Sequence, residues 1–427
     1  MAKTPLAWLI IYFIGCLAAF INPYYGLLTY IFEYFNHPPM HWWGKYLPHL
    51  RWSLTVALVT FIAMFIKGKF PQMINNVIQN SQFKWLILLL IDMAVITYLN
   101  AVSVKESEKY LIMFLKLVIL FLMITTLINT KKEYQLFIWL IILGCFLFGW
   151  NATMNPKLIH GRLENVGGPD TREANFLALL MIMPLPFIGL YFFIGKRWEK
   201  ILSIVVAPFI LNTIILCNSR GAFVALIIAA AYLLFFYKGK TRLSKKKIIF
   251  ALTLGIMLFF YLTDQRFWDR MKSLTQVEDT ESAAKVSSER LDAWIGALKL
   301  MKDHPFGVGG GGYDLLSPIY IPEIVARHRG QLRTVHNTYL LVGSDWGTQG
   351  LIFFLGFLGS TFLKLRKGRK KLGENNIRLY AESVAIECAL VGILTGSIFV
   401  NRLYAESIYW LCGLAFVLEK IAHEYKE

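Results

Sequence analysis

Long apolar runs alternate with short polar connections along most of this 427-residue chain. A helix that spans a bilayer needs about 20 predominantly apolar residues, and about twelve segments approach that description. The predicted spans are Leu6–Phe20, Trp52–Ile66, Trp85–Val102, Leu111–Ile128, Tyr134–Trp150, Ala174–Ile194, Ile201–Cys217, Gly221–Tyr237, Ile248–Thr263, Thr338–Leu363, Leu379–Val400 and Ala405–Ile421. The pattern therefore predicts an all-α, polytopic integral membrane protein with about 12 transmembrane helices.

The composition favours a bilayer as the environment of these runs. Hydrophobic residues make up 56% of the chain and the mean hydropathy is +0.51, which is too apolar for an ordinary soluble domain. The first span follows only Lys3 and precedes no small-residue cleavage site, so we predict a retained helix and not a signal peptide. The five cysteines fall within or beside apolar spans, which argues against a disulfide or a zinc site.

The charge pattern orients the spans. A formal net charge of +17 could attract nucleic acid, but the basic residues cluster in short connections, so we expect membrane lipids and no nucleic acid as partners. If the N-terminus is cytoplasmic, the inner connections carry Lys67/Lys69/Lys84, Lys131/Lys132, Lys196/Arg197/Lys200 and the basic runs 238–247 and 364–371. The positive-inside rule therefore predicts a cytoplasmic face for these connections and for the C-terminus.

The opposite, extracytoplasmic face then receives three longer segments, Ile21–Arg51, Asn151–Glu173 and 264–337. Only the last of these is large enough for a small folded unit. We predict a division into residues 1–263 with spans 1–9, a large extracytoplasmic (periplasmic) loop with amphipathic helices at 264–337, and residues 338–427 with the last three spans and a cytoplasmic C-terminus.

The large loop carries two helix signals and one glycine-rich stretch. Residues 264–274 place apolar side chains at helical spacing, which is typical of a helix lying in the membrane interface. Ser287 or Ser288 is expected to N-cap a second helix that ends before His304. The stretch 307–312 follows no strand and lacks the Lys-Ser/Thr ending of a nucleotide-binding loop, so we predict a flexible or tightly turning loop.

Arg220 is the first candidate functional residue, because it begins a predicted span at the outer face. An arginine near a bilayer is costly unless it faces protein, water or an anion. Its side chain either extends to the lipid headgroups or binds an anion together with the free backbone N–H groups of the helix start.

Arg290 and His336 are the second and third candidates. Arg290 shares a helical turn with Glu289, so it either forms a local ion pair or offers a guanidinium that contacts phosphate oxygens bidentately. His336 lies where the large loop re-enters the membrane, and it is either a hydrogen-bonded structural residue or a general base at a water-accessible mouth. In the second case Asn337 would orient it.

The outer stretch 162–175 holds further polar residues close to the entrance of a span, namely Arg162, Arg172, Glu173 and Asn175. These side chains either line a polar cavity or belong to an ordinary solvated loop.

In combination, these motifs resemble the O-antigen ligase and O-antigen polymerase superfamily of bacterial envelope glycan enzymes. The matching stretches, in chain order, are Ser219–Ala222, Arg290 with Trp294, His304–Gly309, His336–Leu340, and Gly347 with Gly350. Where the superfamily often carries a glutamate downstream, this chain has Asp345. The segment around Asn22–Trp43 is also similar to O-glycosylation ligases associated with exosortase systems.

The resemblance implies a GT-C-like glycosyltransferase in the bacterial inner membrane with its active site facing the periplasm. The donor would be a glycan on undecaprenyl pyrophosphate, and the acceptor a hydroxyl of lipid A core, another glycan, a lipid or a protein; inversion is expected, and no metal or other cofactor. By position, Arg220 and Arg290 would hold the pyrophosphate and stabilise its growing charge, and His336 would deprotonate the acceptor. The remaining residues expected to bind substrate or line the cavity are Arg333, Asn337, Arg162, Arg172 and Asn175.

Other functions stay open. A polymerase would use the same donor chemistry to extend the donor's own chain. A flippase or transporter of lipid-linked sugars would predict inverted repeats and charges near the membrane midplane, neither of which is evident; Lys116 and Glu387 lie within spans without an assigned role. A structural scaffold would leave the grouping of Arg220, Arg290 and His336 on one side to chance.

Overall fold

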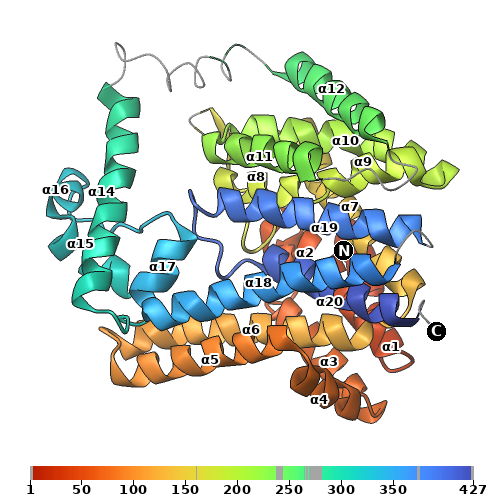
Figure 1. The fold of residues 1–427 in the computed structure, drawn as a ribbon, viewed down its shortest axis with the longest axis horizontal. Coiled ribbons are helices and arrows are strands. Elements are labelled where there is room, and N and C mark those ends of the chain that lie inside the picture. The colour runs from red at the N-terminus through yellow and green to blue at the C-terminus, as the bar shows by residue number, and fades with distance from the viewer. Residues whose placement is uncertain are drawn as a thin grey trace.

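The computed structural model describes residues 3–159, 161–236, 244–263, 265, 268, 281–372 and 376–424. They form an almost entirely helical bundle (Figure 1). The bundle contains α1 (Lys3–Ala19), α2 (Pro23–Phe35), α3 (Trp52–Ile66), α4 (Phe70–Gln79), α5 (Ser81–Leu99), α6 (Val104–Leu127), α7 (Lys131–Met154), α8 (Ala174–Ile182), α9 (Leu185–Ile194), α10 (Arg197–Cys217), α11 (Arg220–Phe236), α12 (Lys245–Leu262), α18 (Gly347–Leu372), α19 (Ile377–Gly396) and α20 (Glu406–Glu424). In the described part of the chain, strands occur only as the antiparallel pair β1 (Leu158–Ile159) and β2 (Arg162–Leu163).

Several helices are long and apolar enough to cross a membrane. Among the described residues six segments meet that description, or seven if the bent pair α3 and α4 counts as one span. The six are Ser81–Leu99, Val104–Leu127, Lys131–Met154, Ala174–Ile194, Arg197–Cys217 and Gly347–Leu372. The chain is therefore an all-α integral membrane protein. The total of about 12 spans and the GT-C-like architecture stay predictions.

One predicted span, Thr338–Leu363, is broken in the structure. The helix stops at Asp345 and a new one starts at Gly347, so α17 (Thr338–Asp345) and α18 replace a single rod. Gly347 has a φ of +71°, a left-handed conformation that glycine adopts without steric cost and that ends a helix.

The first part of the bundle contains a helix that the apolar pattern missed. Residues 21–51, expected as an outer loop, include α2, whose Leu27 and Ile31 are completely buried. Because α2 runs back between them, α1 and α3 run in the same direction and not in opposite ones. The three helices pack closely, since Gly15 of α1 and Gly26 of α2 each lie against a threonine of the next helix. Only 13 residues long, α2 is too short to register as a span.

The connections between helices gather at two ends of the bundle (Figure 1). At one, which we call the basic end, Lys131 Nζ lies 3.4 Å from Asn376 Oδ1 and Arg378 Nη2 lies 2.6 Å from Glu199 Oε1. Glu387, left unassigned by the sequence, is 3% exposed and pairs with Arg369. Lys116 is exposed on α6. Basic connections thus lie together, as a common membrane face requires.

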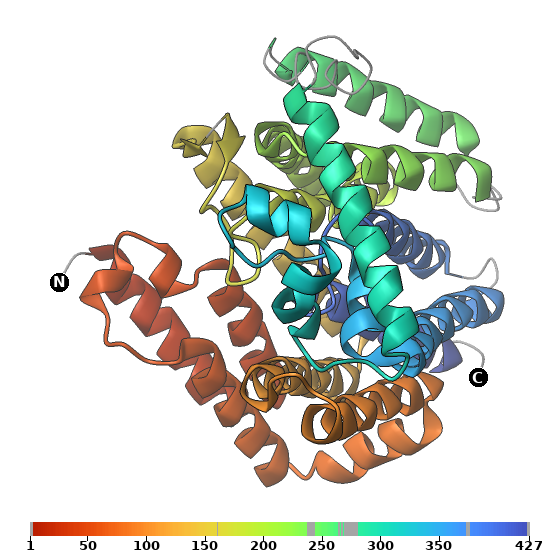
Figure 2. The same cartoon turned by 90° about the vertical axis from the view of Figure 1, so that its left-hand side faces the viewer.

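The opposite end, which we call the α14 end, carries a cap of helices that stand across the bundle. They are α14 (Glu281–Asp303), α15 (Gly312–Tyr320), α16 (Pro322–Arg327) and α17. Figure 2 looks onto this end and shows α14 crossing in front of the other helices. Near the start of α1, Trp8 packs on Trp43 and Trp52, with ring centroids 5.9 and 5.0 Å apart, so α1 and α3 begin side by side. The other end of α1 leads to Tyr24, whose OH donates to the Glu133 carbonyl at 2.6 Å, next to Lys131 of the basic end. The first helix therefore runs toward the basic end, contrary to the expected orientation of the N-terminus.

The helix signals in the large loop are partly confirmed. α14 ends at Asp303, directly before His304, as predicted. It begins at Glu281, however, so Ser287 and Ser288 lie inside the helix and neither is its N-cap. The sequence Glu-Ser-Ala-Ala upstream contains good helix formers that extend the helix backwards. The interfacial helix predicted at 264–274 lies outside the described residues, apart from Gln265 and Trp268.

The glycine-rich stretch forms a tight turn around Asp345. Its buried carboxylate accepts hydrogen bonds from the backbone N–H groups of Gly311, at 2.9 Å, and Tyr313, at 3.0 Å. A Cβ at Gly310 would come within 2.8 Å of the Trp346 ring, so the backbone approaches too closely for a larger residue. Asp345 therefore fixes the start of α15 against α17.

Candidate functional site

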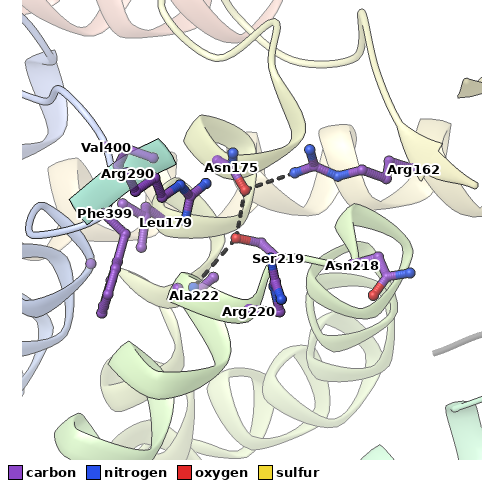
Figure 3. A pocket seen from close by; sticks show the side chains of 12 residues that line it. Arg162, Asn175, Leu179, Asn218, Ser219, Arg220, Ala222, Arg290, Phe399 and Val400 are labelled. Carbon is purple, nitrogen blue, oxygen red and sulfur yellow. Dashed lines mark hydrogen bonds between the residues drawn. The ribbon is translucent and has the colours of Figure 1, made fainter. Parts of the chain in front are cut away.

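A cavity of about 110 Å³ opens at the α14 end, between α8, α11, α14 and the connection 397–405 (Figure 3). Its lining consists of Arg162, Asn175, Leu179, Asn218, Ser219, Arg220, Gly221, Ala222, Arg290, Gly396, Phe399 and Val400. One bound water needs about 10–15 Å³ by this measure, so the cavity can hold several waters or a compact charged group. Three guanidinium groups from distant parts of the sequence meet in it.

Arg220 reaches the cavity through a sharp turn between α10 and α11. Asn218 ends α10 in a left-handed conformation with a φ of +48°, which asparagine tolerates better than most residues. Ser219 then caps α11: its Oγ accepts a hydrogen bond from Ala222 N at 3.4 Å and donates one to Asn175 Oδ1 at 2.8 Å. As a result, Arg220 and the first turn of α11 face the cavity, where the helix start favours negative charge.

Arg162 lines the same side of the cavity as the Ser219 turn and is held in place. Its Nη2 donates to Asn175 Oδ1 at 2.7 Å and its Nε donates to the carbonyl of Cys217 at 3.3 Å. Asn175 thus joins Arg162 to the Ser219 turn. The close-up shows this chain of contacts running along one side of the cavity (Figure 3).

Arg220 and Arg290 lack partners of this kind. No hydrogen bond or ion pair within the described residues engages either guanidinium, and none of the lining residues is acidic. Burial, together with the charges of Arg220 and Arg162, lowers the pKa of Arg290. An arginine stays protonated in proteins, so this lowering reflects the cost of burying a charged group and, after that, repulsion among three like charges; a bound anion would offset both.

His336 lies beside this arginine group, in the segment that leads into α17. Its backbone is left-handed, with a φ of +49°, and Asn337 follows as the N-cap of α17, accepting hydrogen bonds from Tyr339 N at 2.9 Å and Leu340 N at 3.1 Å. Burial and the charges of Arg290 and Arg333 lower the pKa of His336 from 6.5 to about 4. The imidazole is therefore neutral at physiological pH and has a ring nitrogen that can accept a proton.

Comparison with known families supports the resemblance that the sequence motifs indicate. A sequence model of the family described as O-Antigen ligase matches residues 204–355, a stretch that contains Arg220, Arg290 and His336. The match covers about a third of the chain and supports its place in the O-antigen ligase superfamily. Its members are ligases and polymerases of glycosyltransferase-like kind, so this protein is an enzyme of that general kind. No curated protein matches the chain.

The other residues predicted to bind substrate, Arg333, Arg172 and Asn337, are not among the residues that line the cavity. Arg333 Nη2 lies 3.1 Å from His328 Nε2, at the edge of the arginine group. Arg172 is exposed and does not line the cavity. Asn337 is buried and acts on the helix start, as described above. Glu289, the expected local partner of Arg290, instead pairs with His328 at 3.2 Å and with Arg327 at 3.7 Å.

The motifs found in the sequence did not include the connection 397–405, which forms one wall of the cavity. Phe399 and Val400 contribute its apolar part. The one signal in the sequence was the pair Asn401-Arg402, two polar residues between apolar runs. Arg402 is only 2% exposed, so its charge is buried inside the protein and not displayed on a loop.

Proposed function

We propose that this protein is a glycosyltransferase of the O-antigen ligase type. It transfers a glycan from undecaprenyl pyrophosphate, or a related polyprenyl pyrophosphate, to a hydroxyl acceptor at the extracytoplasmic face of the inner membrane. The observation that carries the proposal is the cavity lined by Arg162, Arg220 and Arg290 without an acidic residue. Two of these guanidiniums are free of protein partners in the described part of the chain, and a pyrophosphate offers the bidentate oxygens that arginine prefers.

In the proposed reaction the bond between the donor sugar C1 and the pyrophosphate oxygen breaks, and the electron pair leaves with the pyrophosphate. Negative charge on the leaving group therefore grows in the transition state. Arg220 and Arg290, preorganised in a partly buried site, stabilise this charge more strongly than they stabilise the bound donor. Because they stabilise the transition state more than the bound donor, the two guanidiniums accelerate departure of the pyrophosphate.

His336 completes the reaction from the acceptor side. The acceptor oxygen forms the new bond to C1 and its proton passes to the neutral imidazole. Attack on the face opposite the leaving group inverts the configuration at C1. Because the low pKa of His336 makes it a weak base, proton transfer is expected late, when bond formation has already acidified the hydroxyl.

The proposal is tested by reconstituting the purified, full-length protein in proteoliposomes with a defined polyprenyl-pyrophosphate glycan. Lipid A core, a second lipid-linked glycan and a Ser/Thr peptide are offered separately, and products are identified by mass spectrometry. Transfer to the lipid A core supports the ligase, and chain extension of the lipid-linked glycan would redirect the proposal to a polymerase. Movement of donor across the bilayer without any product would refute glycosyl transfer.

Substitutions test the assigned roles in the same assay. Arg220→Ala and His336→Ala should abolish most transfer while membrane insertion and protein level stay normal. Arg172→Ala is the matched control, because it removes an arginine from the same end of the bundle that is exposed and outside the cavity. Full activity of His336→Ala would remove the base assignment.

A further inference from the structure

Arg402 is a buried arginine that the proposed chemistry does not use. Its side chain is 2% exposed, and its Nη1 donates to the carbonyl oxygen of Asp170 at 2.9 Å while Nη2 lies 3.5 Å from Asp170 Oδ2. Its Cζ lies 5.2 Å from the centre of the Phe176 ring. Phe176 follows Asn175, which lines the cavity, so Arg402 attaches the connection 397–405 to the donor side of the site.

Asp170 is itself anchored on two further elements. Its Oδ1 accepts a hydrogen bond from Tyr34 OH at the end of α2, and its Oδ2 accepts one from Glu406 N at the start of α20, at 3.2 Å. Asp170 therefore presents a fixed partner to Arg402. An ion pair between a buried arginine and a partly buried carboxylate contributes little net stability compared with apolar packing, but it specifies one arrangement of the elements that it joins.

The same connection also holds the segment that contains His336. Thr338 N donates to Ser397 O at 2.9 Å, Thr338 Oγ1 donates to Val400 O at 2.7 Å, and Arg402 N donates to Thr338 Oγ1 at 2.8 Å. On the other side of His336, Asn401 Nδ2 donates to Thr334 Oγ1 at 2.7 Å. These contacts bracket the left-handed turn at His336 from both sides.

We infer that Arg402 is a positioning residue, which holds the connection 397–405 so that His336 stays beside the guanidinium groups of the donor cavity. The inference rests on the proposed function, in which His336 serves the acceptor and the arginines serve the donor. Phe399 and Val400 connect the His336 segment to the arginine cavity, because they belong to the connection 397–405 and also line the cavity. Arg402 thereby sets the distance between base and leaving group without touching substrate.

This role has a signature that a merely structural role lacks. The pKa of His336 is lowered to about 4 partly because Arg290 and Arg333 are close. If loss of Arg402 lets the turn move away from these charges or become more hydrated, the pKa rises toward its ordinary value of 6.5. A simple loss of folded protein would reduce activity at every pH and leave the acidic limb of the pH profile in place.

The experiment compares full-length wild type, Arg402→Lys and Arg402→Met in proteoliposomes. We expect Arg402→Met to lower kcat by about 10–100-fold with little change in the donor KM, because misplacement of a catalytic group by about 1 Å has effects of this size. Its acidic limb should move to higher pH. Arg402→Lys keeps the charge but not the planar guanidinium, so its kcat should lie between those of wild type and Arg402→Met. The matched control is Arg378→Lys, which weakens a buried ion pair with Glu199 at the basic end and should not move the limb.

A second readout separates this inference from the proposed function. Diethyl pyrocarbonate modifies neutral imidazole, so its pH-dependent labelling of His336, followed by peptide mass spectrometry, reports the pKa without turnover. A higher labelling midpoint in Arg402→Met supports the inference even if wild type transfers no glycan, and an unchanged midpoint overturns it. Unchanged kcat and pH profile in an active preparation would overturn it as well. If Arg402→Met does not fold, Asp170→Asn is used, since it keeps the carbonyl acceptor of Arg402 and removes the negative charge that faces Arg402, Tyr34 and the backbone N of Glu406.

Discussion

Replacement of Arg290 by alanine offers the sharpest test of the site, because one guanidinium affects two measurable quantities. It faces the cavity without a protein partner in the described residues, and its charge is one cause of the low pKa of His336. In the proposed reaction Arg290→Ala therefore removes a donor to the leaving pyrophosphate and also removes a charge that keeps His336 neutral. The first effect lowers the rate, and the second moves the pH profile.

The size of the rate effect follows from the surroundings of the group. Deletion of one preorganised donor to a developing negative charge costs about 3–4 kcal/mol, which corresponds to a loss of about 10²–10³ in kcat/KM. Arg220 stays in the cavity and retains part of the stabilisation, so the loss should not exceed this range. Arg290→Lys keeps the charge but loses bidentate contact, and we expect a loss of about tenfold from it.

The assay is turnover of the lipid-linked donor at a fixed, saturating concentration of acceptor in proteoliposomes, recorded over the acidic and neutral range for wild type, Arg290→Ala and Arg290→Lys. The acidic limb of Arg290→Ala should lie at higher pH than that of wild type, and the limb of Arg290→Lys should lie close to wild type. Equal kcat/KM in Arg290→Ala and wild type would refute the role of the guanidinium. A lower rate with an unmoved limb would refute the electrostatic coupling to His336.

Two further predictions concern the same end of the molecule. The kcat/KM of wild type should fall as the pH drops through about 4 and not through 6.5, because only neutral His336 accepts a proton and its pKa is lowered by burial and by Arg290 and Arg333; a pH profile of the reconstituted enzyme decides between these values. Asp345→Ala should destabilise the protein by about 2–4 kcal/mol, since it leaves the buried N–H groups of Gly311 and Tyr313 without an acceptor. Thermal unfolding in detergent measures this loss, and an unchanged midpoint would contradict the capping role of Asp345.

Much of the fold could be predicted from hydropathy, because bilayer-spanning helices need long apolar runs. Helices such as α7 and α10 match predicted spans to within four residues at each end for that reason. Hydropathy missed α2, however, because this helix is short and carries Glu33 among its aromatic residues. Its presence reverses the direction of α1, so a single missed helix altered the predicted orientation of everything before it.

The candidate site could be predicted in its parts but not in its assembly. Arg220 stood out because a charged residue at the end of an apolar run needs an explanation, and Arg290 because it lies at the start of the helix predicted in the outer loop. Arg162 and Arg172 lie in one polar stretch and looked equivalent, yet packing turns the first into the cavity and leaves the second exposed. Which side chains share a cavity depends on how helices pack, and a single sequence carries no direct signal of that packing.

The left-handed backbone at His336 has a practical consequence for the study of the enzyme. Most side chains are strained at a φ of +49°, but glycine adopts this conformation freely. His336→Gly should therefore preserve the turn before α17 and leave a void where the imidazole ring lay. Imidazole added to the solution could enter that void and restore turnover in a concentration-dependent manner. Substituted imidazoles of different basicity could then be added to the same variant, which would measure how the rate depends on the strength of the base.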